Sequence, residues 1–83
     1  MDKRELLKNF GKNVKIERIK KDLTQEQFAE ILGVSTNYVA CVENGRQNMS
    51  LGKILELSHA LLIEINKLLD FTNKYLQLYI IYK

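Results

Sequence analysis

Residues 24–45 read TQEQFAEILGVSTNYVACVENG, and this stretch decides the fold. Thr24 and Gln27 have the Thr-x-x-Gln spacing of a capping box, which predicts that a helix begins directly after Thr24. Gly33 suits the left-handed conformation that ends a helix, and Ser35 is a second hydroxyl cap just beyond it. The stretch therefore predicts two short amphipathic helices joined by a tight glycine turn.

The apolar residues of this stretch indicate how the two helices pack. Phe28, Ala29 and Leu32 share one face of the first helix, and Ala29 must be small because the helices cross closely there. Val39 and Val42 share one face of the second helix and would hold it against the first. Such a two-helix unit is typical of proteins that place the second helix in the major groove of DNA.

The flanking sequence predicts three more helices around this unit. The first would run from about Lys3 or Glu5 to Lys21, with an apolar stripe formed by Phe10, Val14, Ile19 and Leu7. Ser50 would cap a fourth helix, whose stripe is formed by Leu51, Ile54, Leu55, Ser58 and Leu61. A short fifth helix is expected near Glu64 to Leu69, and we place the glycines at helix boundaries or in the fourth helix.

Length and composition limit the class of protein. A chain of 83 residues that is 46% hydrophobic fits one small domain with a core, and it has no proline to interrupt helices. The apolar runs fall short of the roughly 20 residues of a membrane span, and no signal peptide is evident. One cysteine and one histidine predict neither a disulfide framework nor a metal site. We expect a cytoplasmic protein with no cofactor and no membrane partner.

The charge is concentrated at the N-terminus. Residues 1–21 carry eight basic and three acidic side chains, a net of +5, so the remaining residues carry −2 of the total +3. A basic first helix suits a polyanion, although a solvated helix face would look the same. We expect Lys12, Lys15 and Lys20 to add diffuse attraction rather than fixed contacts.

An ordered set of residues carries a family resemblance. Gln25, Ala29, Gly33, Val39 and Val42, together with LTQEQ at 23–27 and VENGR at 42–46, are similar to the phage repressor and Cro-like (Xre-type) helix-turn-helix family. The resemblance spans about residues 10–70. It implies an all-α, compact five-helix repressor-like DNA-binding domain, which we assign to residues 1–70. It also implies a sequence-specific transcription regulator, in keeping with the lack of any nucleophile–base pair that would predict an enzyme.

The chain departs from the family pattern at three places. Glu17 stands where the first helix usually has an apolar residue, and Met49 replaces the usual proline before the fourth helix. Residues 62–64 (LIE) stand where a glycine or asparagine and then a cap usually open the fifth helix. That junction is therefore either continuous or differently capped.

The outer face of the second helix of the unit would read DNA. It would present Thr36, Asn37, Ala40, Cys41 and Asn44. The resemblance implies that Thr36 and Asn37 are the main base-reading residues. Asparagine can pair with adenine through two hydrogen bonds, and threonine can bond to a base or touch a thymine methyl. Ala40 and Cys41 are small enough for apolar contact with thymine, so we expect an A·T-containing half-site.

Other residues are expected to contact the DNA backbone or to hold the reading helix. Gln25 opens a helix whose amides and dipole favour a phosphate, and the resemblance implies that it binds the backbone and buttresses the reading helix. The further backbone candidates are Tyr38, Asn44, Arg46 and Gln47. Tyr38 is equally well explained as a half-buried packing residue. The resemblance also implies an ion pair between Arg18 and Glu43, the alternative being two independent surface charges.

The C-terminal extension, residues 71–83, fits a helix and a strand equally well. Apolar residues there and in the fifth helix predict a homodimer contact formed by Ile65, Leu68, Phe71, Leu76, Leu78, Tyr79 and Tyr82. A dimer would read two half-sites about 34 Å apart in a palindromic operator and would act, most simply, as a repressor. The alternative is an antitoxin-like interaction module whose tail binds a different protein. Glu26 and Glu30 form either an acidic patch for RNA polymerase or a solvated face.

Overall fold

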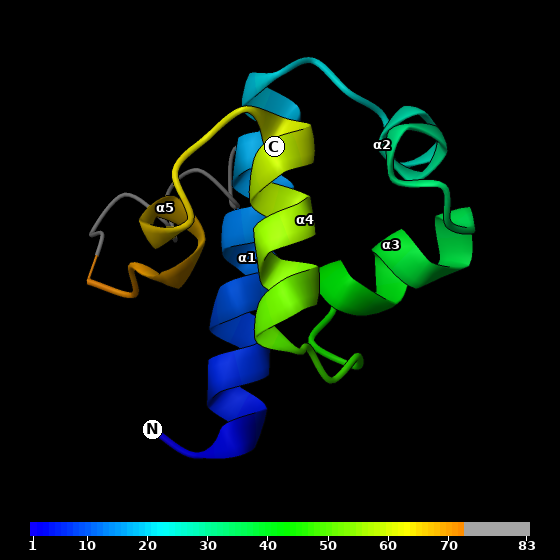
Figure 1. Cartoon of the computed structure of the whole chain (residues 1–83). Helices are drawn as coiled ribbons and strands as arrows, with labels where there is room; N and C mark the ends of the chain where they lie inside the picture. Colours follow the sequence, from blue (N-terminus) through cyan, green and yellow to red (C-terminus); the bar gives the residue numbers. More distant parts are fainter. Residues whose placement is uncertain (73–83) are drawn as a thin grey trace.

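The computed structural model describes residues 1–72, and this part of the chain is built from α-helices without a strand (Figure 1). The elements are α1 (Lys3–Lys20), α2 (Gln25–Leu32), α3 (Thr36–Glu43), α4 (Leu51–Leu61) and α5 (Asn66–Leu69). The predicted all-α, five-helix architecture is confirmed. The end of the extension, residues 73–83, lies outside the described residues, and with it the question of helix or strand.

Two long helices form the centre of the molecule. In Figure 1, α1 and α4 lie side by side, with α2 and α3 on one side of them and α5 on the other. α1 contacts α3, α4 and α5, and α2 contacts α3 and α4. None of the helices in residues 1–72 is long and apolar enough to cross a membrane.

The ends of α2 and α3 are formed by the predicted capping residues. Thr24 Oγ1 accepts a hydrogen bond from the Gln27 amide at 3.0 Å, and Gln27 Oε1 accepts from the Thr24 amide at 2.9 Å. Ser35 Oγ accepts from the Tyr38 amide at 3.0 Å and opens α3. Gly33 ends α2 with φ at +70°, and a Cβ there would meet nothing within 4 Å. Backbone conformation, not space, is therefore the reason for glycine at this turn.

The core is formed where all five helices meet. Its buried apolar residues are Phe10, Val14, Phe28, Ala29, Val39, Val42, Ile54, Leu57, Leu61 and Leu68. The stripe predicted for α1 is partly wrong, because Ile16 is buried whereas Ile19 and Leu7 are only partly covered. The stripe predicted for α4 is also partly wrong, because Leu57 is buried whereas Leu51 and Leu55 are 77% and 44% exposed.

The placement of one glycine was wrong as well. Gly11 lies in the middle of α1, not at a helix boundary. A Cβ at Gly11 would overlap the backbone carbonyl groups of Val42 and Glu43, with the Glu43 oxygen only 2.6 Å away. Glycine therefore lets the C-terminal end of α3 lie directly against α1.

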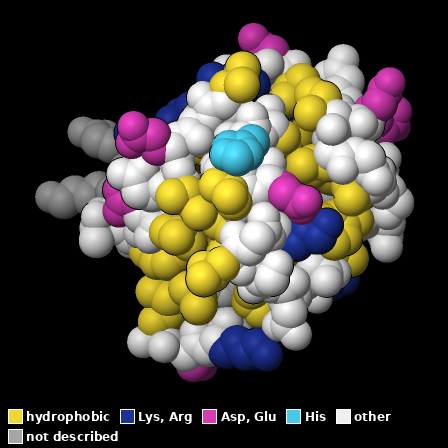
Figure 2. Space-filling model, in the orientation of Figure 1, with side chains coloured by type: hydrophobic (Ala, Val, Ile, Leu, Met, Phe, Trp, Pro, Cys, Tyr) yellow, Lys and Arg dark blue, Asp and Glu magenta, His cyan; other side chains and the backbone are white. Residues whose placement is uncertain are grey.

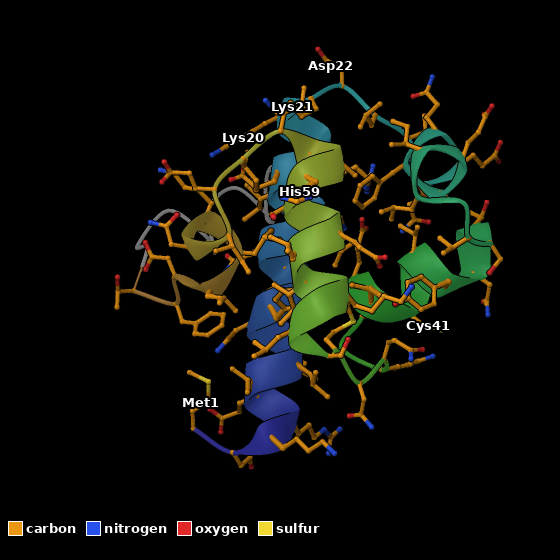
Figure 3. The ribbon with its side chains drawn as sticks, in the orientation of Figure 1. Met1, Lys20, Lys21, Asp22, Cys41 and His59 are labelled. Carbon is orange, nitrogen blue, oxygen red and sulfur yellow. The ribbon has the colours of Figure 1, made fainter. Side chains whose placement is uncertain are left out.

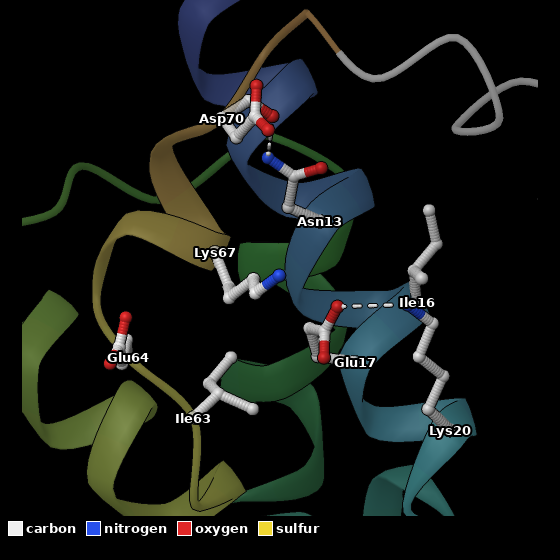
Figure 4. A pocket seen from close by; sticks show the side chains of 8 residues that line it. All are labelled: Asn13, Ile16, Glu17, Lys20, Ile63, Glu64, Lys67 and Asp70. Atoms are coloured by element: carbon white, nitrogen blue, oxygen red, sulfur yellow. Dashed lines mark hydrogen bonds and ion pairs between the residues drawn. The ribbon is translucent and has the colours of Figure 1, made fainter.

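The connection from α4 to α5 is broken, not continuous. Leu62 ends α4 in the left-handed conformation, with φ at +58°, and α5 begins at Asn66 without a side-chain cap. The buried amide of Asn13 holds α5 in place by donating to the carbonyl oxygens of Leu68 at 2.9 Å and Asp70 at 3.0 Å. Figure 4 shows the contact between Asn13 and Asp70. A hollow of about 320 Å³ remains between α1 and this segment, and Glu17 lies in its wall.

Asp70 is the last residue held by Asn13, and its carboxylate closes a local turn. The Thr72 hydroxyl and the Thr72 amide both donate to Asp70 Oδ1, at 2.7 and 3.0 Å, which lowers the pKa of the Asp70 carboxyl. Hydrogen bonds thus fix the backbone that follows α5 as far as residue 72.

Candidate nucleic-acid interface

The outer face of α3 is open to solvent along its length. Thr36, Asn37 and Asn44 are exposed, and Ala40 and Cys41 are partly exposed. Figure 3 shows Cys41 on α3, on the side of the molecule away from α5. Beneath this face, Val39 and Val42 are 1% and 2% exposed and pack into the core. The helix therefore presents small and polar side chains outward from a buried apolar base.

A buried ion pair ties α3 to α1. Arg18 Nε donates to Glu43 Oε2 at 2.6 Å, and Arg18 Nη2 donates to Glu43 Oε1 at 3.1 Å. The two residues are only 8% and 7% exposed. Arg18 Nη1 also donates to the carbonyl oxygen of Leu23 at 2.7 Å, so the guanidinium group fixes the α1–α2 connection as well. A forked, charge-assisted contact of this kind sets orientation as well as distance.

Gln25 joins this network from the first turn of α2. Its Nε2 donates to Glu43 Oε1 at 3.0 Å, which links the start of α2 to the C-terminal end of α3. A carboxamide nitrogen carries two hydrogens, and one of them is left for another acceptor. Gln25 is partly exposed, so this second hydrogen and the helix N-terminus are available to a phosphate. Side chains from α1 and α2 thus both hydrogen-bond the Glu43 carboxylate of α3.

The remaining backbone candidates divide into two kinds. Arg46 is exposed and Gln47 partly exposed, both in the loop that follows α3. Tyr38 is half-buried against the core, and its hydroxyl lies 3.9 Å from the Met49 sulfur. The ring of Tyr38 is thus a packing residue, which is the alternative to a contact with the DNA backbone.

The loop after α3 also packs against α1, which the sequence interpretation missed. Gly45 has φ at +74°, and a Cβ there would lie 2.9 Å from the Cα atom of Lys8. Gly11 makes the corresponding close approach one turn further along α1. A glycine inside a helix costs about 1 kcal/mol relative to alanine, so Gly11 was a signal that another backbone lies close by.

Comparison with known proteins agrees with this geometry. The family model described as helix-turn-helix matches residues 14–68. The chain belongs to this helix-turn-helix family, of the Xre type. The predicted family is therefore confirmed. The family consists of DNA-binding regulators and is not a class of enzymes. This helix-turn-helix protein is accordingly a sequence-specific DNA-binding transcription regulator.

Two relatives that resemble the chain are control proteins. The control protein C.SmaI of Serratia marcescens is 38% identical over 69 residues, which are 83% of this chain and 79% of that protein. The crystal structure of the restriction-modification controller protein C.AhdI from Aeromonas hydrophila is similar with 42% identity and a TM-score of 0.70, covering 75% of this chain and 94% of that one.

A third similarity extends over more of the chain. The crystal structure of the hypothetical transcription factor NHTF from Neisseria matches with a TM-score of 0.78 and 29% identity. It covers 94% of this chain and 90% of that one. The helix-turn-helix unit and the helices around it are therefore shared with this structure too.

Proposed function

We propose that this helix-turn-helix regulator is a control protein of a restriction-modification system, which binds a palindromic operator as a homodimer. The observation that carries the proposal is the open face of α3, held by the Arg18–Glu43 pair, in a chain that is similar over most of its length to two control proteins. Bound at a promoter, the dimer would repress transcription by occupancy. Because DNA is its partner, we place the protein in the cytoplasm.

The reading surface favours A·T pairs. Asn37 is exposed near the start of α3, where a recognition helix reaches deepest into the major groove, and its amide matches the edge of adenine. Thr36 beside it can bond to a base or touch a thymine methyl. Ala40 and Cys41 leave the middle of the helix smooth, which suits close approach to thymine methyl groups.

Backbone contacts would flank this surface. Gln25 would donate its second amide hydrogen to one phosphate, and Arg46 and Gln47 would bind the other strand from the loop after α3. Asn44, at the exposed end of α3, lies between the reading face and that loop. Tyr38 would contribute through its hydroxyl only if its contact with Met49 gave way.

The dimer contact would involve an apolar face of α4. Leu51 and Leu55 are one turn apart on this helix and are 77% and 44% exposed, and Leu62, which ends the helix, is 82% exposed. Figure 2 shows hydrophobic side chains gathered beside His59 over α4 and α5. Of the predicted contacts in and around α5, Ile65 and Phe71 are partly buried. Leu68 is fully buried in the core, so we do not propose it as a dimer contact. The further predicted contacts Leu76, Leu78, Tyr79 and Tyr82 lie outside the described residues.

Contact with RNA polymerase would come from α2. Glu26 and Glu30 are exposed one turn apart on that helix, and neither forms an ion pair among the interactions found in residues 1–72. This acidic surface would act in addition to DNA binding if the bound dimer activates a promoter.

Selection from random duplex DNA tests the proposal. The purified protein should retain a palindrome with two A·T-containing half-sites, as the dimer and Asn37 predict. Asn37→Ala should lose about 1–3 kcal/mol of discrimination at one position of each half-site. Asn66→Ala, an exposed asparagine on α5, is the matched control and should bind normally. No enrichment at modest salt would contradict the proposal, and a stable complex with a different protein would then favour the antitoxin-like alternative.

A further inference from the structure

Three lysines lie on one face of α1. Lys8, Lys12 and Lys15 are four and three residues apart, which places their side chains along the same side of a helix. They line a hollow of about 300 Å³ whose other walls are Glu43 and Asn44, at the C-terminal end of α3. The lysine face therefore adjoins the end of the helix that reads DNA.

The two close approaches to α1 bring these elements together. Gly11 lets the carbonyl groups of Val42 and Glu43 lie against α1, and Gly45 lets the following loop lie against Lys8. The next residue of that loop is Arg46, which is exposed. The lysine face consequently adjoins both Asn44 and the loop that carries Arg46.

No ion pair neutralises the lysines of this face within the described part of the chain. The ion pairs found in residues 1–72 involve none of the three lysines. The Glu43 carboxylate in the wall already accepts hydrogen bonds from Arg18 and Gln25, so its negative charge is paired with Arg18. Lys8 is exposed and Lys12 and Lys15 are partly exposed, so their ammonium groups can meet an external anion.

We propose that Lys8, Lys12 and Lys15 bind phosphates of the DNA backbone that flank the bases read by α3. The inference rests on the proposed function and adds a fixed contact where composition predicts only diffuse attraction. Lysine binds phosphate as a compact point charge, and an open hollow admits a strand that continues past the end of α3. Such a contact strengthens binding to every sequence and carries no base preference.

The test compares two double variants with the same change in charge. Lys8→Gln/Lys12→Gln removes two charges from the lysine face, whereas Lys3→Gln/Lys67→Gln removes two exposed charges from outside it. Affinity for the selected operator is measured over a series of salt concentrations. The slope of log K against log salt should fall in magnitude by about 0.9 for each phosphate that the variant no longer neutralises. We expect this fall for the first variant and a much smaller change for the second.

Phosphate ethylation locates the contact directly. In the wild-type complex, ethylation should interfere at phosphates flanking each half-site, and this interference should disappear in Lys8→Gln/Lys12→Gln. Lys8→Arg/Lys12→Arg keeps the charge and should restore both the slope and the interference. Preference for the operator over a mismatched site should be unchanged in all these variants.

The possible negative results separate the lysine contact from the proposed function. Equal slopes for the two glutamine variants, with wild-type binding intact, would overturn the lysine contact and leave the proposed function standing. Interference that persists in Lys8→Gln/Lys12→Gln would overturn it too. Failure of the wild-type protein to select any DNA would instead overturn the proposed function on which the inference rests.

Discussion

Gly11 shows how much one residue can decide in a small domain. It lies in the interior of α1, where alanine would be favoured by about 1 kcal/mol on helix propensity alone. The missing Cβ leaves room for the carbonyl groups that end α3, and both α3 and the loop beyond it pack against α1 for this reason. The cost in helix propensity is offset by the contact between α1 and the reading helix.

Gly11→Ala should lower the free energy of unfolding by about 1–3 kcal/mol, because the new methyl group forces two backbones apart. Chemical denaturation measures the change. Gly52→Ala is the control, since the nearest atom to a Cβ there is Ser50 Oγ at 3.9 Å, and it should leave stability equal or higher. Equal stability for Gly11→Ala would show that α3 can move away from α1 without cost.

At the scale of elements, the Arg18–Glu43 pair joins helices that are separated along the chain. The pair is buried, so both charges have lost most of their hydration, and a buried pair is weak evidence of net stability. Its geometry is better explained by orientation. Arg18 reaches both Leu23 and Glu43, and Gln25 reaches Glu43 from α2, so the end of α3 is held from two sides.

Arg18→Ala should weaken DNA binding mainly because α3 loses its fixed orientation. It should also destabilise the fold by about 3–5 kcal/mol, since Glu43 is left buried without its partner. Operator affinity, measured at a temperature where circular dichroism shows the variant fully folded, separates the two effects. Unchanged affinity in that folded variant would contradict the orienting role.

Arg18→Lys serves as the second variant in case Arg18→Ala does not fold. It keeps the positive charge but cannot form the forked contact to both Glu43 oxygens. We expect stability and affinity between those of the wild type and Arg18→Ala. Full wild-type affinity would mean that charge alone, without the fork, orients α3.

At the scale of the molecule, the two proposed contact surfaces lie on different elements. The proposed reading face belongs to α3, whereas the exposed leucines lie on α4 and at its C-terminal end (Figure 1). Contiguous apolar surface of this kind on a small domain marks an interaction site. A second copy bound through α4 would leave both α3 faces free for two half-sites.

Leu55→Glu should convert the dimer into a folded monomer, because two buried carboxylates would face each other across a symmetric contact. Sedimentation measures the mass, and operator affinity should fall because each subunit binds its half-site alone. Ile31→Glu, on α2, changes a residue of similar exposure (56% against 44%) and should remain dimeric. A dimeric Leu55→Glu would move the interface away from this face of α4.

The sequence alone determined the features that depend on near neighbours. Thr24, Gln27, Ser35 and Gly33 act within three residues of themselves, through caps and backbone conformation, so their roles could be inferred without any tertiary contact. The inward face of α3 followed from helical spacing for the same reason. The family resemblance rested on this locally encoded unit.

Tertiary structure alone decided which of several equivalent apolar residues are buried and what lies beside the reading helix. Leucines occur on both sides of α4, so spacing could not distinguish Leu57, which is 3% exposed, from Leu55, which is 44% exposed. Which of these leucines is buried depends on where α1 and α2 pack against α4. The meeting of Lys8, Lys12 and Lys15 with the end of α3 is equally non-local. It exists because Gly11 and Gly45 let distant backbones touch, and no local pattern encodes a contact between segments so far apart in the chain.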